Sequence, residues 1–265
     1  AAYSSGKPAY GVGAGNSSIV IDETADVDIA ASNTKTSKVS DFGSGCSADG
    51  NIIIHKSIYS KMIKSLEKEG GYLCNSQQKS LLEKVMWDEK GRRTFQTIAC
   101  SPQKITDIAG FKIPEDIKFL MVENNNQIGS EHKFSQEKLT TVMSLYSFDD
   151  FTHALDLVKK IYSTAGKGHS CGIYSHSEKN IDALARTAPV SRMMVRQPQS
   201  KANAGSFTNG MPMTSSLGCG IWGGNITNEN VTLKHMLNYT WVSFPIEQDR
   251  PSEKDLFGEF YGKKI

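Results

Sequence analysis

Short apolar runs alternate along this chain with segments in which apolar residues recur at helical spacing. The runs fall at residues 19–21, 51–55, 119–122, 142–146, 170–174 and 192–195, and their length and apolar character predict buried strands. The segments with helical spacing fall at residues 22–40, 56–68, 76–86, 148–163 and 178–187. Asp22 and Thr24 are candidate N-caps of the first of these helices. Strands separated by helices predict an α/β fold with a mostly parallel sheet flanked by helices.

Two glycine-rich segments, residues 11–16 and 40–50, interrupt this alternation. The second carries Cys46 among glycines and other small residues, which let a ligand approach the backbone closely and leave the thiol uncrowded. That arrangement favours an attacking thiol, although a free cysteine is more often a small buried residue. The other four cysteines are expected to be buried in that way: Cys74, Cys100, Cys171 and Cys219. The chain has no CxxC pair and no zinc-ligand spacing, so we expect no metal site.

Composition indicates a folded chain without a strong charge preference. The 265 residues are 38% hydrophobic and 22% charged, with a formal net charge of +2. These values favour neither an intrinsically disordered chain nor a nucleic-acid partner. No apolar stretch of about eighteen residues and no signal-peptide pattern occurs, so we expect a cytoplasmic protein without a membrane partner.

Two polar segments next to predicted strands add candidate chemistry. Glu137 stands in a turn before the strand at residues 142–146, where a glutamate is most often a solvated surface charge. His169 follows a glycine and precedes the strand at residues 170–174, where the ordinary interpretation is a structural histidine. Each position is compatible with a functional role as well.

A long polar loop at residues 197–210 follows the last predicted strand. Loops of this length inside a compact domain are often functional. Arg192 and Arg196 lie just before it, four positions apart, where they could form an anion clamp or a simple surface pair.

Taken in order, these segments resemble one known family. The segments are residues 11–16, the glycine-flanked Cys46, Glu-Lys-Leu at 137–139, Gly-His at 168–169, and Gly-Cys-Gly-Ile-Trp-Gly-Gly-Asn at 218–225. The chain resembles the CoA-acylating branch of the aldehyde dehydrogenases over essentially its whole length. Within that branch it is most similar to acylating sulfoacetaldehyde dehydrogenases and next to acylating succinate-semialdehyde enzymes. The resemblance implies an aldehyde dehydrogenase-like catalytic domain, the C-terminal half of a longer enzyme.

The resemblance also implies roles for individual residues. Cys46 would be the nucleophile, forming a thiohemiacetal with the aldehyde and then a thioester that coenzyme A takes over, and its amide would supply half of an oxyanion hole. Glu137 would hold the ribose of NAD or NADP, while Gly43 and Gly45 would keep the thiol loop open for aldehyde and nicotinamide. Hydrolytic relatives carry a glutamate where Val12 stands. Because valine cannot act as a general base, this position favours acyl transfer to coenzyme A over hydrolysis.

The aldehyde implied by the resemblance is short and anionic at its far end. A cation should then face that end of the substrate. We expect Arg192 and Arg196 to supply it, with Asn203 and Asn209 as hydrogen-bond partners.

The resemblance further divides the chain into segments. Residues 1–21 would contain the last strand of a cofactor domain whose phosphate-binding loop is not in this sequence, and residues 22–210 would be the catalytic domain. Residues 211–238 would return toward the cofactor domain, and residues 239–265 would be an oligomerisation strand and tail. Residues 239–243 alternate outward and inward like an edge strand that pairs with a neighbouring subunit. We therefore expect a homodimer or homotetramer.

Two other functions stay open. One is a truncated, catalytically incompetent fragment that acts only in assembly. The other is a stand-alone cysteine hydrolase or acyltransferase that pairs Cys46 with His55 or His169. This second function requires one of the two histidines to lie within hydrogen-bond reach of the sulfur.

Overall fold

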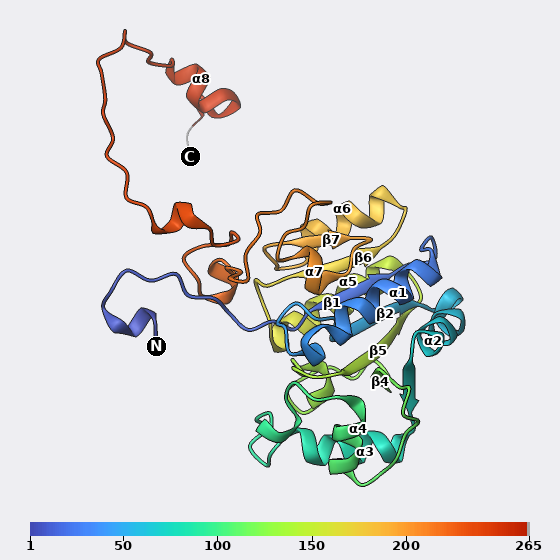
Figure 1. The fold of residues 1–265 in the computed structure, drawn as a ribbon. Helices are drawn as coiled ribbons and strands as arrows, with labels where there is room; N and C mark the ends of the chain where they lie inside the picture. The colour runs from blue at the N-terminus through green and yellow to red at the C-terminus, as the bar shows by residue number, and fades with distance from the viewer. Residues whose placement is uncertain (264–265) are drawn as a thin grey trace. The chain divides into compact units, whose positions relative to one another are not determined.

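The computed structural model describes residues 1–263, and the chain forms two compact units, Ala1–Thr232 and Leu233–Ile265. The described residues of the first unit form a seven-stranded sheet in the order β3-β4-β5-β2-β1-β6-β7, with every neighbouring pair parallel (Figure 1). Its strands are β1 (Ser18–Ile21), β2 (Asn51–His55), β3 (Gly71–Cys74), β4 (Phe119–Glu123), β5 (Val142–Phe148), β6 (Cys171–Tyr174) and β7 (Met193–Val195). The predicted α/β class with a parallel sheet is confirmed.

Helices connect these strands and cover the sheet. They are α1 (Val27–Val39), α2 (Tyr59–Lys68), α3 (Ser76–Met86), α4 (Pro102–Ala109), α5 (Phe151–Thr164), α6 (Glu178–Thr187) and α7 (Gln199–Ala202). Five of them begin after a side chain that accepts a hydrogen bond from an amide of the first turn, namely α1 (Asp26), α3 (Asn75), α4 (Ser101), α5 (Asp150) and α6 (Ser177). Such caps satisfy amides that the helix itself leaves without a partner.

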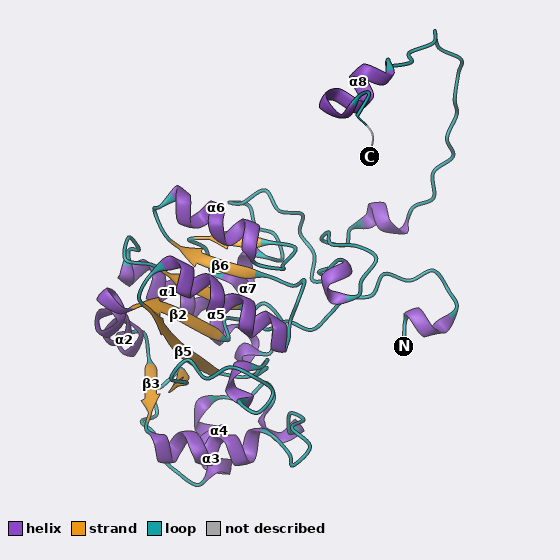
Figure 2. Cartoon of the chain, turned by 180° about the vertical axis from the view of Figure 1, so that it is seen from behind, coloured by secondary structure: helices purple, strands orange, loops and turns teal. Residues whose placement is uncertain are grey.

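The sheet is buried on both faces, which explains why its strands occur as continuous apolar runs in the sequence. In β2, Ile52 and Ile54 join a core cluster with residues of α1 and α2, whereas Ile53 points to the opposite face and joins residues of α5 and α6. Figure 2 shows these helices next to the strands of the sheet. At one end of the sheet, α3 and α4 pack together against Leu120 and Val122 of β4 (Figure 1).

Strand β1 lies in the middle of the sheet. Ser18 is in register with Asn51 of β2 on one side and with Cys171 of β6 on the other, and all four β1 residues are at most 1% exposed. The assignment of this strand, within residues 1–21, to a separate cofactor domain is therefore wrong, because β1 completes the sheet that carries the other candidate residues. The boundaries of the remaining predicted segments stay predictions.

The first helix begins later than the sequence suggested. Asp26 caps α1, since its side chain accepts from the Ile29 amide at 3.1 Å. Asp22 is instead buried, and its carboxylate accepts from the Thr24 amide (2.9 Å) and from the side chain of Asn180 on α6 (2.8 Å). Asp22 thus ties the end of β1 to α6 rather than starting a helix. The helix at residues 178–187 is confirmed as α6, while β3 and α4 were not predicted.

The second unit contains short helical segments at Leu233–Met236, Glu253–Phe257 (α8) and Gly258–Phe260. Residues 239–243 form no strand within the single chain, and Trp241 is 94% exposed. Their predicted pairing with a second subunit stays a prediction.

No helix among the described residues is long and apolar enough to cross a membrane. The described residues also contain no cluster of three or more histidine, cysteine, aspartate or glutamate side chains suited to hold a metal ion.

Candidate active site

Four segments that lie far apart in the sequence meet at the amino edge of the sheet. Gly15 precedes β1, Cys46 precedes β2, Glu137 precedes β5 and His169 precedes β6. Because the strands are parallel, residues that precede them reach the same edge. The Gly15 amide donates to Glu137 Oε1 at 3.1 Å, and His169 Nε2 lies 2.9 Å from Cys46 Sγ.

Cys46 stands on a tight turn between α1 and β2. The Ala48 amide donates to the Gly45 carbonyl at 2.9 Å, which makes Cys46 and Ser47 the two central residues of the turn. Gly15 passes so close behind the turn that a Cβ at this position would overlap the Cys46 carbonyl oxygen. Cys46 is half-buried, whereas the other four cysteines are buried, as predicted. The turn therefore presents this one thiol at the surface of the site.

His169 is the hydrogen-bond partner of the thiol. Its ring is 1% exposed, and its Nδ1 lies 2.9 Å from Ser170 Oγ. This network is satisfied when Nδ1 carries the proton and donates to Ser170, which leaves Nε2 free to accept the proton of Cys46.

Burial sets the protonation of this pair. Burial, together with the carboxylate of Glu137, raises the pKa of the Cys46 thiol. Burial, with a contribution from the charge of Arg192, lowers the pKa of His169 to about 4. At neutral pH the pair is therefore a neutral thiol and a neutral imidazole. Such a pair removes the thiol proton as the sulfur attacks, by general-base catalysis.

The three residues predicted to contact the cofactor, Glu137, Gly43 and Gly45, differ in their surroundings. Glu137 is half-buried, and burial raises its pKa to about 7; one oxygen accepts from Gly15, and the other has no hydrogen-bond partner among the described residues. Apart from its two neighbours in the chain, a Cβ on Gly45 would meet no atom within 4 Å, so the loop is open at Gly45. Gly43 is buried with φ +68°, and a Cβ there would lie 2.5 Å from the Thr140 carbonyl oxygen. Gly43 therefore supports the loop by packing against its neighbours.

Arg192 and Arg196 lie at opposite edges of the sheet, because Arg192 precedes β7 and Arg196 follows it. The buried guanidinium of Arg192 donates to three carbonyl oxygens, those of His169 (3.1 Å), Gly218 (2.7 Å) and Asn228 (3.0 Å). Arg196 is exposed and donates to the carbonyl of Ser175, beyond the carboxyl end of β6 (2.6 Å). The predicted anion clamp does not form. Arg192 fastens the loop that carries His169, and Arg196 lies at the edge opposite the thiol.

Asn203 and Asn209 fold the loop that contains them. Asn203 is 0% exposed, and its amide donates to the carbonyl of Gln199 at 3.0 Å. The side chain of Asn209 donates to the Ala202 carbonyl at 2.9 Å and accepts from amides of its own loop. None of these hydrogen bonds connects Asn203 or Asn209 to Cys46.

Sequence reasoning offered His169 and His55 equally as partners of the thiol. His55 ends β2 and therefore lies at the carboxyl edge, where its Nε2 is 2.9 Å from the Asp149 carbonyl oxygen. The sequence signal that could have favoured His169 is the pair of glycines at positions 166 and 168. With φ values of +82° and +88°, these two glycines form the tight loop before β6. A Cβ on Gly168 would overlap the Cys219 carbonyl, so this loop requires glycine.

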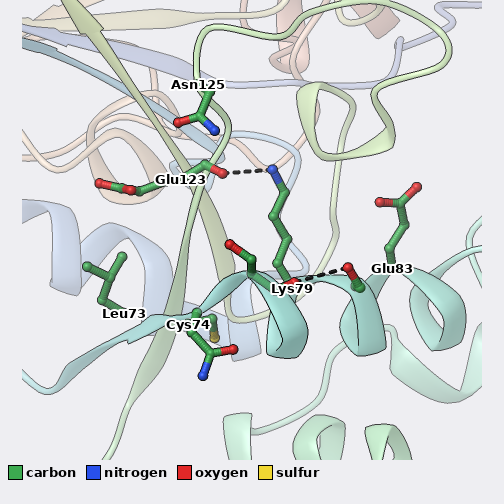
Figure 3. A pocket seen from close by; sticks show the side chains of 9 residues that line it. Leu73, Cys74, Lys79, Glu83, Glu123 and Asn125 are labelled. Atoms are coloured by element: carbon green, nitrogen blue, oxygen red, sulfur yellow. Dashed lines mark hydrogen bonds between the residues drawn. The ribbon is translucent and has the colours of Figure 1, made fainter.

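A cavity of about 520 Å³ lies at the carboxyl edge, lined by the end of β3, the first turns of α3 and residues at and after the end of β4. Figure 3 shows the side chains that line it. Lys79 reaches across it and donates to the Glu123 carbonyl (2.7 Å) and to Asn124 Oδ1 (2.9 Å). Its ammonium group is thus held by the cavity wall. This cavity is separate from the Cys46 site, which lies at the other edge.

The fold and the site together define a parallel α/β domain in which a half-buried cysteine thiol contacts a buried histidine. Residues 2–73 match the aldehyde dehydrogenase family. The chain is 43% identical over 264 residues to a sulfoacetaldehyde dehydrogenase of Acholeplasma sp, which covers 98% of this chain and 54% of that protein. It is 34% identical to the succinate-semialdehyde dehydrogenase (acetylating) of Clostridium kluyveri, covering 97% of this chain and 57% of that protein.

Among solved structures, an acetylating aldehyde dehydrogenase from Geobacillus thermoglucosidasius has a TM-score of 0.89 and 33% identity, covering 94% of this chain and 55% of that chain. The chain belongs to the aldehyde dehydrogenase family. It spans about half the length of the curated relatives that it matches.

Proposed function

We propose that this chain carries the catalytic cysteine of a CoA-acylating aldehyde dehydrogenase, which converts a short aldehyde into its acyl-CoA thioester. The observation that carries the proposal is the 2.9 Å contact between the half-exposed thiol of Cys46 and Nε2 of His169. Because the chain spans about half of its relatives, the complete reaction is proposed for a protein that also supplies the region those relatives have beyond the match.

The reaction begins with attack of Cys46 Sγ on the carbonyl carbon. His169 Nε2 takes the thiol proton, and the oxygen of the resulting thiohemiacetal accepts a hydrogen bond from the Cys46 amide. The thiohemiacetal carbon must give up a hydride to become a thioester, and this is the chemistry that a bound nicotinamide cofactor, NAD or NADP, supplies. The thiol of coenzyme A then attacks the thioester and gives up its proton, so that acyl-CoA leaves and Cys46 regains a proton. His169 lies within reach of the sulfur for both proton movements.

The described residues fit the nicotinamide end of such a cofactor. The second oxygen of Glu137 has no hydrogen-bond partner among the described residues and can accept from a ribose hydroxyl. The open loop at Gly45 leaves room for the aldehyde and the ring. Both features lie on the same edge of the sheet as Cys46.

Two observations support acyl transfer to coenzyme A rather than release of a free acid. Val12, on the glycine-rich segment before β1, is 54% exposed and carries no group that could activate water. Two of the relatives named above, those of Clostridium kluyveri and Geobacillus thermoglucosidasius, are described as acetylating enzymes. The names sulfoacetaldehyde dehydrogenase and succinate-semialdehyde dehydrogenase support a short aldehyde with an anionic far end.

The assembly and location belong to the same proposal. The exposed apolar side chains of residues 239–246 support a homodimer or homotetramer in which this segment pairs with a neighbouring subunit. All five cysteines are free, which supports a reducing compartment such as the cytoplasm.

The test is the intact mass of the protein after incubation with short acyl-CoA donors, because acyl transfer to the thiol reverses the last step and needs no nicotinamide. We expect one acyl adduct that is lost in Cys46→Ala and kept in the matched control Cys74→Ala, whose thiol is buried. No adduct with any donor, or an adduct that persists in Cys46→Ala, would contradict the proposal.

A stand-alone cysteine hydrolase or acyltransferase is the second candidate. The contact between Cys46 and His169 meets its geometric requirement. It differs from the first candidate in the fate of the acyl group, which a hydrolase would give to water.

A further inference from the structure

One buried pair of side chains next to the Cys46 turn, Asp49 and Gln199, contains two polar atoms without a hydrogen-bond partner. Among the described residues, nine buried side-chain atoms have no partner, and two of them, Asp49 Oδ2 and Gln199 Oε1, belong to residues that are hydrogen-bonded to each other. A buried polar atom without a partner costs about 1–3 kcal/mol. Two such acceptors in one bonded pair therefore require an explanation.

Asp49 links this pair to the nucleophile. It follows the turn three positions after Cys46 and is 0% exposed. Its amide donates to Ser37 Oγ on α1 (3.3 Å), and its Oδ1 accepts from Gln199 Nε2 on α7 (2.6 Å). The same Nε2 donates to the Ser18 carbonyl on β1 at 3.2 Å. The amide and the side chain of Asp49 thus tie the end of the turn to α1 and α7, and Gln199 continues the connection to β1.

The surroundings of Asp49 disfavour a charged carboxylate. Asp49 takes part in none of the ion pairs found within 4.0 Å among the described residues. The titratable groups that face it are Lys38 of α1, Tyr162 of α5 and Tyr174 of β6. Burial raises the pKa of Asp49 to about 7, and the hydrogen bonds of Gln199 and Ser37, with the charge of Lys38, offset this only in part. Burial also lowers the pKa of Lys38 to about 7.

A proton on Asp49 Oδ2 satisfies both unpartnered atoms at once. The carboxylic acid then donates from Oδ2 to Gln199 Oε1, while Oδ1 keeps accepting from Gln199 Nε2, as acids and primary amides pair through two bonds. A charged carboxylate would instead leave two acceptors without donors in the interior.

We propose that Asp49, protonated and paired with Gln199 through two hydrogen bonds, is a positioning residue that holds the Cys46 turn in the geometry for acyl transfer. Asp49 makes no contact with the reacting atoms and acts through the turn that carries the thiol and amide of Cys46. The inference rests on the proposed function.

The test compares Asp49→Asn, Asp49→Leu and the control Asp41→Asn. Asparagine at position 49 can form the same two bonds with Gln199, whereas leucine can form neither. Asp41 is an exposed carboxylate of the same loop, with φ +47°, a conformation that asparagine tolerates. Two rates are measured for each protein: acylation of Cys46 by acyl-CoA, and alkylation of the same thiol by iodoacetamide across the pH range.

We expect Asp49→Asn and Asp41→Asn to match the unaltered protein within about threefold in both rates. Asp49→Leu should lose about 10- to 100-fold in acylation while its alkylation stays within about threefold, because only acylation needs the aligned amide. The midpoint of the alkylation pH profile should be the same in Asp49→Asn and the unaltered protein, since no charge is removed.

Three results would overturn the inference: acylation that survives in Asp49→Leu, acylation lost equally in Asp49→Asn, or a lower alkylation midpoint in Asp49→Asn. The last result would show that Asp49 is charged. Absence of acylation in the unaltered protein would instead overturn the proposed function, and the alkylation profiles would still decide the protonation of Asp49. If Asp49→Leu fails to fold, the alkylation profiles of Asp49→Asn and the unaltered protein still decide the protonation of Asp49.

Discussion

Replacing His169 by glutamine removes the base that contacts the nucleophile. Glutamine can still form hydrogen bonds, but it cannot take up the thiol proton. Burial and Glu137 raise the pKa of Cys46, so the thiol is protonated at neutral pH and its attack depends on a base. The 2.9 Å separation of Nε2 and Sγ places His169 within reach of the thiol proton, and the proposed function assigns it as that base.

The size of the effect follows from this geometry. General-base assistance contributes about 10²–10⁴-fold to a rate, which corresponds to about 3–5 kcal/mol of activation free energy. His169→Gln should therefore be acylated by acyl-CoA about 10²–10⁴-fold more slowly than the unaltered protein. Because the pKa of His169 is lowered to about 4 from 6.5, acylation in the unaltered protein should show no loss of rate near pH 6.5 as the pH falls.

The assay is rapid quenching followed by intact mass spectrometry, at several pH values from neutral to about pH 4.5, a range that contains the ordinary histidine pKa. His153→Gln, at a half-exposed histidine of α5, is the matched control and should leave the rate unchanged. The reasoning is refuted if His169→Gln stays within about threefold of the unaltered protein. It is equally refuted if the unaltered protein loses activity with a midpoint near pH 6.5, the unperturbed histidine value.

Three further predictions follow from the same contacts. Gly15→Ala should lower the acylation rate at least about tenfold in the mass assay, because its Cβ would overlap the carbonyl oxygen of Cys46, and an unchanged rate would contradict this close approach. Arg192→Met should lower the free energy of unfolding by about 2–4 kcal/mol, because it removes the charged donor from three carbonyl oxygens. Arg196→Met should lower it by less than about 1 kcal/mol. Urea unfolding measures both losses, and equal losses would contradict the structural role assigned to Arg192. The pKa of His169 is about 4 in the folded protein, against an ordinary value of 6.5. The contribution of His169 to the free energy of unfolding is therefore complete above pH 6.5 and is lost as the pH falls toward 4. This loss is about 3 kcal/mol, and a urea series at several pH values should show it in the unaltered protein and not in His169→Gln.

Elements that carry their own local signals were predictable from the sequence. The helical spacing of apolar residues at 178–187 gave α6 its predicted bounds, and in the structure Ser177 caps this helix. The isoleucine runs marked β1 and β2. β3 was missed because its four residues begin at Gly71, which the sequence indicated as the end of the preceding helix. Asp22 was misassigned as a helix cap because its partner Asn180 lies 158 positions away.

The site was predictable only where it is local. The glycines and small residues around Cys46 are neighbours in the sequence, and they are enough to indicate an accessible thiol. The contact with His169 joins residues 123 positions apart and depends on β2, β1 and β6 being adjacent in the sheet, an order that no local pattern encodes. The clamp of Arg192 and Arg196 failed because a strand of only three residues separates them and places them at opposite edges.

The most direct test of acyl transfer is the release of a preformed acyl group from Cys46 with and without coenzyme A. The protein is first acylated with a radiolabelled acyl-CoA and freed of excess donor, and the released product is then identified. With no general base for water at Val12, release should be at least about 100-fold faster with coenzyme A and should yield acyl-CoA. Release at the same rate without coenzyme A, as the free acid, would contradict the proposed function and identify a cysteine hydrolase.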